Sequence, residues 1–131
     1  MNVLLGHCYA GQRMGANNVI RRSLPDGWYL MTPRADLIGG VPAEFSWGAE
    51  SDAATLTAAT ILYDAFGVME LARAAARAFA AQMIAKLPPS EWTLSLAQII
   101  AWLCVWLSRQ AEGGVATSEW PAPSVNGKAG R

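Results

Sequence analysis

The ionisable residues of this chain are few, and their spacing limits the reactions it could catalyse. His7 is the only histidine, so a metal site would need Cys8 together with carboxylates from distant parts of the chain. Neighbouring side chains on a strand point to opposite faces, so His7 and Cys8 could not meet as a nucleophile and its base. The glycines at positions 6, 11, 15, 39 and 40 lack the strand–helix context of a nucleotide-binding fingerprint. We therefore expect no enzymatic activity, no metal ion and no cofactor.

Carboxylates offer the remaining route to catalysis. Four of them precede or begin the apolar segment after residue 50: Asp36, Glu44, Glu50 and Asp52. A pair of these could serve a hydrolase, but acidic side chains in a loop are usually just solvated. A hydrolase that uses them is kept as a third hypothesis.

The charge balance excludes several classes of partner. Ten basic and ten acidic side chains cancel. A nucleic-acid-binding protein that relies on phosphate contacts usually shows a basic excess or stripe, and a DNA mimic is strongly acidic. Direct nucleic-acid binding is therefore not expected. A net charge near zero also gives little protection against self-association, so a homodimer is compatible with the composition.

Cysteine usage and hydropathy indicate a cytoplasmic protein. Cys8 and Cys104 show no paired spacing, and the start "MNVLLGHCYAG" has no basic region followed by a long apolar run. We read both cysteines as reduced thiols. The apolar run around Trp102 is shorter than the roughly 20 residues of a membrane span and contains Gln98, which favours a core helix.

The first third of the chain has the pattern of short strands. Strands are expected at residues 2–9 ("NVLLGHCY"), at 18–23 ("NVIRRS") and from Trp28, after a turn at Pro25–Gly27. Residues 33–45 contain two prolines and a pair of glycines, which predicts a loop.

Three helices are predicted after this region. The first runs from an N-cap at Ser51 or Asp52 to Gly67, with a solvent-exposed strip around Thr57 and Asp64. The second covers Met69 to Leu87 and ends before two prolines. The third begins at the capping box Ser95–Gln98 and closes at Gly113, and its predicted buried stripe is Leu96, Ile99, Ile100, Leu103, Trp106 and Leu107. We expect an α+β fold, in which a small antiparallel sheet from the N-terminal third packs on three helices. A single domain would cover residues 1–112, and residues 113–131 would form a flexible tail.

Three segments together resemble a known family. They are "YAGQR" at residues 9–13, "EFSWGAESDAATLTAATIL" at 44–62 and "FAAQMIAKLPPSEWTLSLAQIIAWL" at 79–103. Their order is similar to that of an uncharacterised family of small proteins from bacteria, archaea and mobile elements. In that family Tyr-x-Gly-x-Arg is followed by a Phe-x-Trp-Gly-Tyr-Gly-Gly-Ser-Gly-Pro loop and later by Leu-Pro-x-x-x-Trp-x-Leu. The resemblance implies no established activity.

The chain departs from this pattern in the loop before the first helix. Only Gly48 and Ser51 match the glycine-rich turn, and Glu50 and Asp52 place negative charge where an anion would bind. Each carboxylate would cost a bound phosphate roughly 1 kcal/mol, while favouring the helix N-terminus. The loop is therefore expected to cap the helix. As an alternative, it could hold a nucleotide-like ligand together with residues near the start of the chain, and the candidate residues are Tyr9, Arg13, Trp47, Gly48, Ser51 and Asp52.

A stripe on the third helix indicates a binding surface. Trp102, Val105 and Arg109 lie opposite Leu96 and Ile100 on a helical wheel, and Trp and Arg are enriched at interface hot spots. Burial of this stripe by the chain's own sheet is the competing interpretation. Two further candidates for contact with a partner, four residues apart on the second helix, are Arg73 and Arg77.

The function favoured by the sequence is a non-catalytic protein-binding module. Its concrete form is a phage or mobile-element counter-defence inhibitor that docks on a host defence complex. This idea is suggested by the occurrence of the resembling family in mobile elements. The alternative is a small-ligand module that uses the Trp47–Asp52 loop.

Overall fold

The computed structural model describes residues 7–15, 17–24, 27–39 and 44–113. The chain divides into two units, residues 1–97 and 98–131, and each is described by itself. Most of the predicted strand at residues 2–9 and of the predicted tail at 113–131 lies outside the described residues. The α+β class predicted from the sequence is confirmed, since the described residues form a four-stranded antiparallel sheet and three α-helices.

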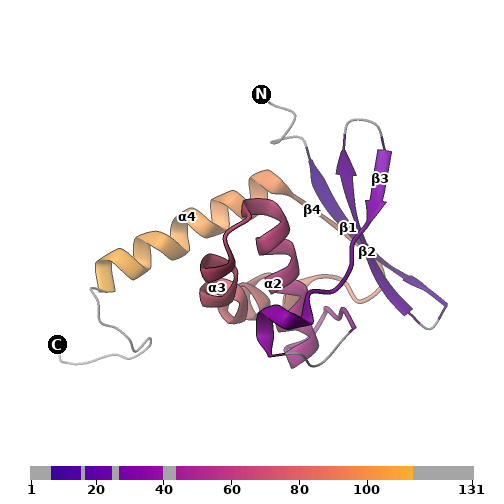
Figure 1. Ribbon diagram of the computed structural model, residues 1–131, viewed down its shortest axis with the longest axis horizontal. Coiled ribbons are helices and arrows are strands. Elements are labelled where there is room, and N and C mark those ends of the chain that lie inside the picture. Colours follow the sequence, from indigo (N-terminus) through magenta and orange to yellow (C-terminus); the bar gives the residue numbers. More distant parts are fainter. Residues whose placement is uncertain (1–6, 16, 25–26, 40–43, 114–131) are drawn as a thin grey trace. The chain divides into compact units, whose positions relative to one another are not determined.

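The sheet has the strand order β3-β2-β1-β4 (Figure 1). Its strands are β1 (Cys8–Met14), β2 (Asn17–Leu24), β3 (Gly27–Leu30) and β4 (Trp92–Ser95). The prediction of a sheet built only from the N-terminal third was incomplete, because β4 pairs with β1 from far along the chain. In β4, buried Trp92 and Leu94 alternate with exposed Thr93, which is the period of a strand with one buried face.

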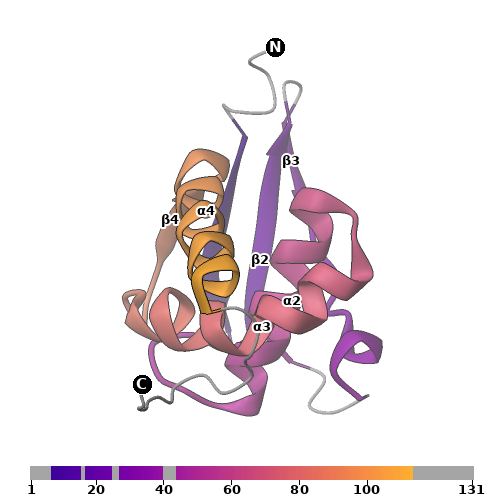
Figure 2. The same cartoon turned by 90° about the vertical axis from the view of Figure 1, so that its left-hand side faces the viewer.

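The two faces of the sheet differ in burial. Tyr9, Ile20 and Leu94 point to one face and are between 0% and 2% exposed. On the opposite face Met14, Trp28 and Leu30 are 54%, 47% and 67% exposed. Figure 2 shows the ribbons of β2 and β3 side by side. The sheet thus covers the core with one face only.

Helix α2 (Asp52–Phe66) has the boundaries that its sequence signals predict. The Ser51 side chain accepts the Ala54 N–H at 3.0 Å, so it is the N-cap. Gly67 ends the helix with φ 72°, a left-handed conformation that glycine adopts without strain. The prediction that Thr57 belongs to a solvent-exposed strip was wrong, because this residue is 0% exposed. Its hydroxyl accepts the Ser46 N–H and lies 2.9 Å from the Ser46 carbonyl oxygen, so it anchors the preceding loop.

Helix α3 (Met69–Gln82) packs on α2 and is shorter than predicted. The predicted end at Leu87 was wrong, because a short 3-10 helix, η2 (Ile84–Lys86), replaces the last turn. The Ile84 carbonyl oxygen accepts the Leu87 N–H at 3.2 Å within η2 and also the Gly48 N–H at 3.1 Å. A second 3-10 helix, η1 (Ala35–Ile38), lies within the segment predicted as a loop.

Helix α4 (Leu96–Gly113) has the predicted extent. Leu96, Ile99 and Leu103 are buried, as expected from their spacing of three and four residues. The prediction that Leu107 is buried was wrong, because this side chain is 46% exposed one turn beyond Leu103.

Candidate functional site

A row of register partners crosses the sheet on the face that meets α2. Leu94, Tyr9, Arg22 and Tyr29 lie side by side on β4, β1, β2 and β3. Leu94 and Tyr9 are 2% and 0% exposed, whereas Tyr29 is 44% exposed, and the Arg22 side chain is 28% exposed. The hydrophobic core therefore ends between Tyr9 and Arg22, and a polar site begins there.

Helix α2 supplies the side of this polar site that lies opposite the sheet. Thr60, Tyr63, Asp64 and Gly67 follow the spacing of one helix face. The Tyr9 hydroxyl donates to Asp64 Oδ2 at 2.8 Å, and Arg22 Nη1 donates to Asp64 Oδ1 at 2.6 Å. Asp64 thus joins β1 and β2 to the C-terminal part of α2.

The electrostatics of this cluster favour positioning over proton transfer. Burial raises the pKa of Tyr9 far above its ordinary value, and the Asp64 carboxylate adds to this rise. The phenol therefore stays protonated and keeps donating to Asp64. Nearby, the His7 ring lies 5.3 Å from the Tyr9 ring, and burial together with the Arg22 charge lowers the pKa of His7.

A pocket of about 360 Å³ opens beside this cluster. Its walls include Arg22, Asp64, Thr60 and Tyr63, and the four consecutive residues 29–32 of β3 and its extension. Successive side chains of a strand point to opposite faces, so a pocket that touches four residues in a row also touches the main chain.

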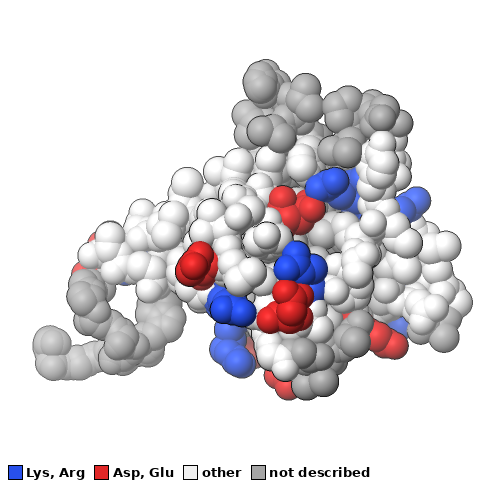
Figure 3. Space-filling model, in the orientation of Figure 1, with Lys and Arg blue, Asp and Glu red and all other residues white. Residues whose placement is uncertain are grey.

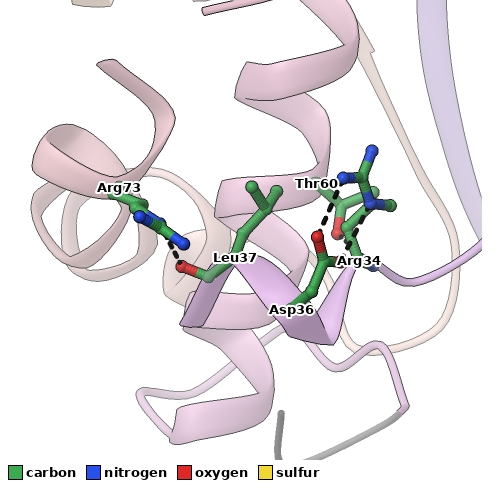
Figure 4. Close-up of polar contacts among 5 residues, drawn as sticks. All are labelled: Arg34, Asp36, Leu37, Thr60 and Arg73. Carbon is green, nitrogen blue, oxygen red and sulfur yellow. Dashed lines mark hydrogen bonds and ion pairs between the residues drawn. The ribbon is translucent and has the colours of Figure 1, made fainter. Parts of the chain in front are cut away.

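Arg34 also lines the pocket, and Figure 4 shows its side chain beside Asp36 of η1. Its Nε and Nη2 donate to the two carboxylate oxygens of Asp36, each at 2.9 Å, and its backbone N–H donates to Thr60 Oγ1 at 3.0 Å. The guanidinium carbon lies 4.7 Å from the centre of the Tyr63 ring, a cation–π geometry. The Arg34 guanidinium lowers the pKa of Asp36, and Asp36 in turn raises the pKa of Arg34.

The charges around the pocket are balanced. Arg22 is paired with Asp64, and Arg34 is paired with Asp36. The pocket also lies at the C-terminal end of α2, where the helix dipole is negative. These walls favour an uncharged or weakly charged ligand with an aromatic ring, and they offer no excess positive charge to a polyphosphate.

The Trp47–Asp52 loop, the alternative ligand site, makes hydrogen bonds that stabilise the fold. The Gly48 N–H bonds to η2, and Ser51 caps α2. Trp47 is 6% exposed, and its indole N–H donates to the Pro89 carbonyl oxygen at 3.0 Å. The expectation that this loop caps the helix is confirmed by the Ser51 hydrogen bond. Asp52 lies at the exposed start of α2.

The other two candidates of the ligand alternative lie elsewhere. Tyr9 bonds to Asp64, twelve residues after Asp52, which is about 18 Å along the helix. Arg13 is exposed near the end of β1. The structure therefore does not bring the Tyr9 hydroxyl to the loop.

The candidate partner-binding residues are found on two helices. On α3, Arg77 is exposed, and Arg73 Nε donates to the Leu37 carbonyl oxygen at 3.2 Å (Figure 4). On α4, Val105 is 51% exposed and Arg109 is exposed. Trp102 is half-buried, and its ring stacks on Trp106 with a centroid distance of 6.0 Å.

Sequence reasoning missed the residues of the pocket. It singled out none of Arg22, Arg34, Tyr63 and Asp64 as ligand-contacting. One signal was available, since Asp64 is the only charged residue between Asp52 and Glu70 and has Thr60 and Tyr63 on the same helix face. An isolated charge in an apolar helix usually has a partner in the fold.

Charge and metal-ligand distributions complete the description of the surface. Figure 3 shows acidic and basic side chains next to one another on the face in view, whereas the visible surface of α4 is mostly uncharged. Within the described ranges no three His, Cys, Asp or Glu side chains are grouped so that they could hold a metal ion. No helix in the same part of the chain is long and apolar enough to cross a membrane.

Comparison with known proteins identifies a family. A search of curated proteins finds no match, and neither does a search of solved structures. A family of unknown function, DUF6166, matches residues 9–105, which is most of the chain and includes β2, β3, β4, α2, α3 and all of β1 except Cys8. The chain therefore belongs to the family of unknown function DUF6166.

Proposed function

We propose that this protein is a non-catalytic protein-binding module that docks through the exposed surface of α4. The supporting observation is the sequence of the helix from Leu96 to Ser108, which contains no Asp, Glu, Lys or Arg. Val105 and Leu107 in this segment are 51% and 46% exposed. A solvated helix face is normally polar or charged, so an uncharged and exposed one favours contact with another molecule.

Arg109 extends this surface. It lies four residues after Val105 and is exposed, so it borders the apolar side chains with a positive charge. Trp102, three residues before Val105, is held by its stack on Trp106, and a pre-ordered aromatic ring loses little entropy on binding. An aromatic anchor beside an arginine is a frequent composition of interface hot spots.

The finer form of the proposal concerns the partner. A cytoplasmic host defence complex is the partner that a phage or mobile-element inhibitor would bind. This form of the proposal rests on the occurrence of the resembling family in mobile elements. Capture from a host lysate tests it directly, because the captured protein is identified by mass spectrometry.

Replacement of Trp102 and Arg109 by alanine is expected to weaken partner capture at least 100-fold. Truncation of a hot-spot side chain typically costs about 2 kcal/mol or more, and 2.8 kcal/mol corresponds to a factor of about one hundred. The measurement is affinity capture from a host lysate followed by titration of the purified partner. Circular dichroism and urea denaturation check that the double variant remains folded.

A matched control places the same types of change on the first unit. Trp28 and Arg13 are exposed residues of the sheet. Their double alanine variant is expected to capture the partner as well as the unmodified chain does. Loss of capture in this control, with retention in the α4 variant, would move the docking surface from α4 to the sheet.

The pocket favours a second candidate function, the binding of a small aromatic ligand. Its walls combine the Tyr29 and Tyr63 rings with two paired guanidinium groups and a volume of about 360 Å³. Because these charges are balanced, a nucleoside suits the pocket better than a nucleoside triphosphate.

A thermal-shift panel is expected to show stabilisation by adenosine or guanosine and none by ATP or GTP. A ligand at one hundred times its dissociation constant adds about 2.7 kcal/mol to the free energy of unfolding, which is roughly 8–11 °C for a domain of this size. Tyr29→Ala is expected to abolish the shift. Trp28→Ala is the control, since Trp28 is next in sequence but points to the other face of the sheet. No shift with any nucleoside, or an equal loss in both variants, would contradict this function.

A further inference from the structure

Among the residues that the structure describes, nothing pairs with the outer edge of strand β3. It is the terminal strand in the order β3-β2-β1-β4, and its sequence, "GWYL", has no charged residue and no proline. Trp28, Tyr29 and Leu30 are 47%, 44% and 67% exposed. Natural sheets usually protect an edge with charges, prolines or bulges, because an open edge pairs readily with another chain.

The direction of the backbone groups shows which residues of β3 can pair outward. The Met31 N–H donates to the Ile20 carbonyl oxygen at 2.8 Å, and Tyr29 is the register partner of Arg22. Backbone groups of successive residues point to opposite sides of a strand, so Met31 and Tyr29 face β2. The N–H and C=O groups of Trp28 and Leu30 therefore face away from β2.

These outward groups are arranged so that two copies of the strand match each other. When two β3 strands lie antiparallel with Tyr29 at the centre, Trp28 is opposite the partner's Leu30, and Leu30 is opposite the partner's Trp28. Both residues of each pair have outward groups, so each pair exchanges two N–H···O bonds. The symmetric register thus satisfies the N–H and C=O groups of Trp28 and of Leu30 in both copies.

The side chains and charges support the same pairing. On the exposed face of the sheet each Trp28 would contact the partner's Leu30, and an aromatic–aliphatic cross-strand pair is favourable. The Arg21 guanidinium lies 5.6 Å from the Trp28 ring centre and flanks this contact. No like charges face one another across the pair, and the chain as a whole has ten basic and ten acidic residues.

We propose that β3 pairs with β3 of a second copy of this chain and forms a two-fold symmetric dimer with a continuous eight-stranded sheet. This interface uses residues of the first unit, whereas the exposed residues proposed for docking on α4 belong to the second unit. A four-residue edge buries less than the roughly 1,200 Å² of a standard stable interface. The dimer is therefore expected to be weak and to dissociate on dilution within the range of about 5 to 500 µM.

Charge exchange at the edge tests the register. The variant Trp28→Lys/Leu30→Lys places lysine opposite lysine in the proposed pairing, and Trp28→Glu/Leu30→Glu places glutamate opposite glutamate. Like charges directly across a strand pair are unfavourable, so each variant alone is expected to be monomeric up to 500 µM. An equimolar mixture of the two is expected to form a heterodimer, because every lysine then faces a glutamate. Analytical ultracentrifugation of the full chain from about 5 to 500 µM measures all three samples beside the unmodified protein.

Two controls separate this interface from others. Thr93→Lys adds a charge to an exposed position of β4, the opposite edge strand, and is expected to leave dimerisation unchanged. The Trp102→Ala/Arg109→Ala variant is expected to dimerise normally. The proposal is overturned if the unmodified chain stays monomeric at 500 µM, if the lysine variant still dimerises, or if the mixture of variants does not associate. It is also overturned if the α4 variant, rather than the β3 variants, becomes monomeric.

Discussion

Replacement of Asp64 by alanine is expected to lower the free energy of unfolding by about 2–4 kcal/mol. The Tyr9 hydroxyl would lose its hydrogen-bond acceptor, and Tyr9 is 0% exposed, so water could not replace it. An unsatisfied buried polar group costs about 1–3 kcal/mol. Arg22 would lose its ion pair, but the two side chains are 28% and 23% exposed, so solvent screening reduces that part to about 1 kcal/mol. Urea denaturation, with an unchanged dependence on denaturant concentration, measures the difference.

A double-mutant cycle with Tyr9→Phe separates the two contributions. Removal of the hydroxyl alone is expected to cost about 1 kcal/mol, because Asp64 keeps its bond to Arg22. In the Asp64→Ala background the same change is expected to be neutral or stabilising, since it removes the orphaned hydroxyl. Asp36→Ala is the matched control, because Asp36 also pairs with an arginine but at an exposed position. An equal effect of Asp64→Ala and Asp36→Ala would contradict the role of the buried hydroxyl.

The Tyr9 hydroxyl also gives the cycle a pH signature. Burial and Asp64 raise the pKa of Tyr9 above its ordinary value of about 10. Below pH 10 the phenol is protonated in both the folded and the unfolded state, so its contribution to stability is complete. As the pH rises above 10 the unfolded state loses the proton first, and stability falls. The part of this alkaline loss that is due to Tyr9 is expected to be absent from Tyr9→Phe.

Signals within a few residues of one another were sufficient to predict the helices. Ser51 caps α2 and Gly67 ends it because each acts on backbone groups of its own turn. The α+β class followed from the change of period after residue 50. The end of α3 was misplaced: η2 follows it, and the Ile84 carbonyl oxygen there also accepts the N–H of Gly48, a residue that no local pattern includes.

Features that depend on distant partners could not be predicted in this way. Strand β4 has four residues, and its assignment depends on pairing with β1, whose Gly11 lies opposite Trp92. The polar cluster joins Tyr9 and Arg22 to Asp64 across 55 and 42 residues. A helical wheel places Asp64 on a face but does not identify the groups that meet it. The same limit explains Thr57, which was assigned to solvent on polarity alone and is buried against the Ser46 backbone.

Replacement of Gly11 by alanine is expected to destabilise the protein by about 3 kcal/mol. A methyl group at this position would lie 2.3–2.4 Å from three atoms of the Trp92 indole. The Trp92 ring is 6% exposed and meets the Trp47 ring edge-on at a centroid distance of 5.4 Å. The ring therefore cannot swing into solvent, and overpacking of a closed site costs about 1–3 kcal/mol or more. Thermal and urea denaturation measure the loss.

Gly67→Ala is the control that separates steric overlap from backbone strain. Gly67 has φ 72° and no atom within 4 Å of an added methyl group, so alanine there costs only the left-handed conformation, about 1–2 kcal/mol. Gly11 is not among the glycines with positive φ, so its cost comes from contact with Trp92. An effect of Gly11→Ala smaller than that of Gly67→Ala would contradict this assignment.

Replacement of the Trp92 indole by a smaller side chain is expected to restore part of the stability lost in Gly11→Ala. Trp92→Leu alone leaves a cavity and destabilises the protein, but it also removes the atoms that an alanine at position 11 would strike. The double variant Gly11→Ala/Trp92→Leu is therefore expected to be more stable, by at least about 1 kcal/mol, than the sum of the two single effects predicts. Additive effects would mean that the methyl group is accommodated by the backbone of β1 rather than resisted by the indole.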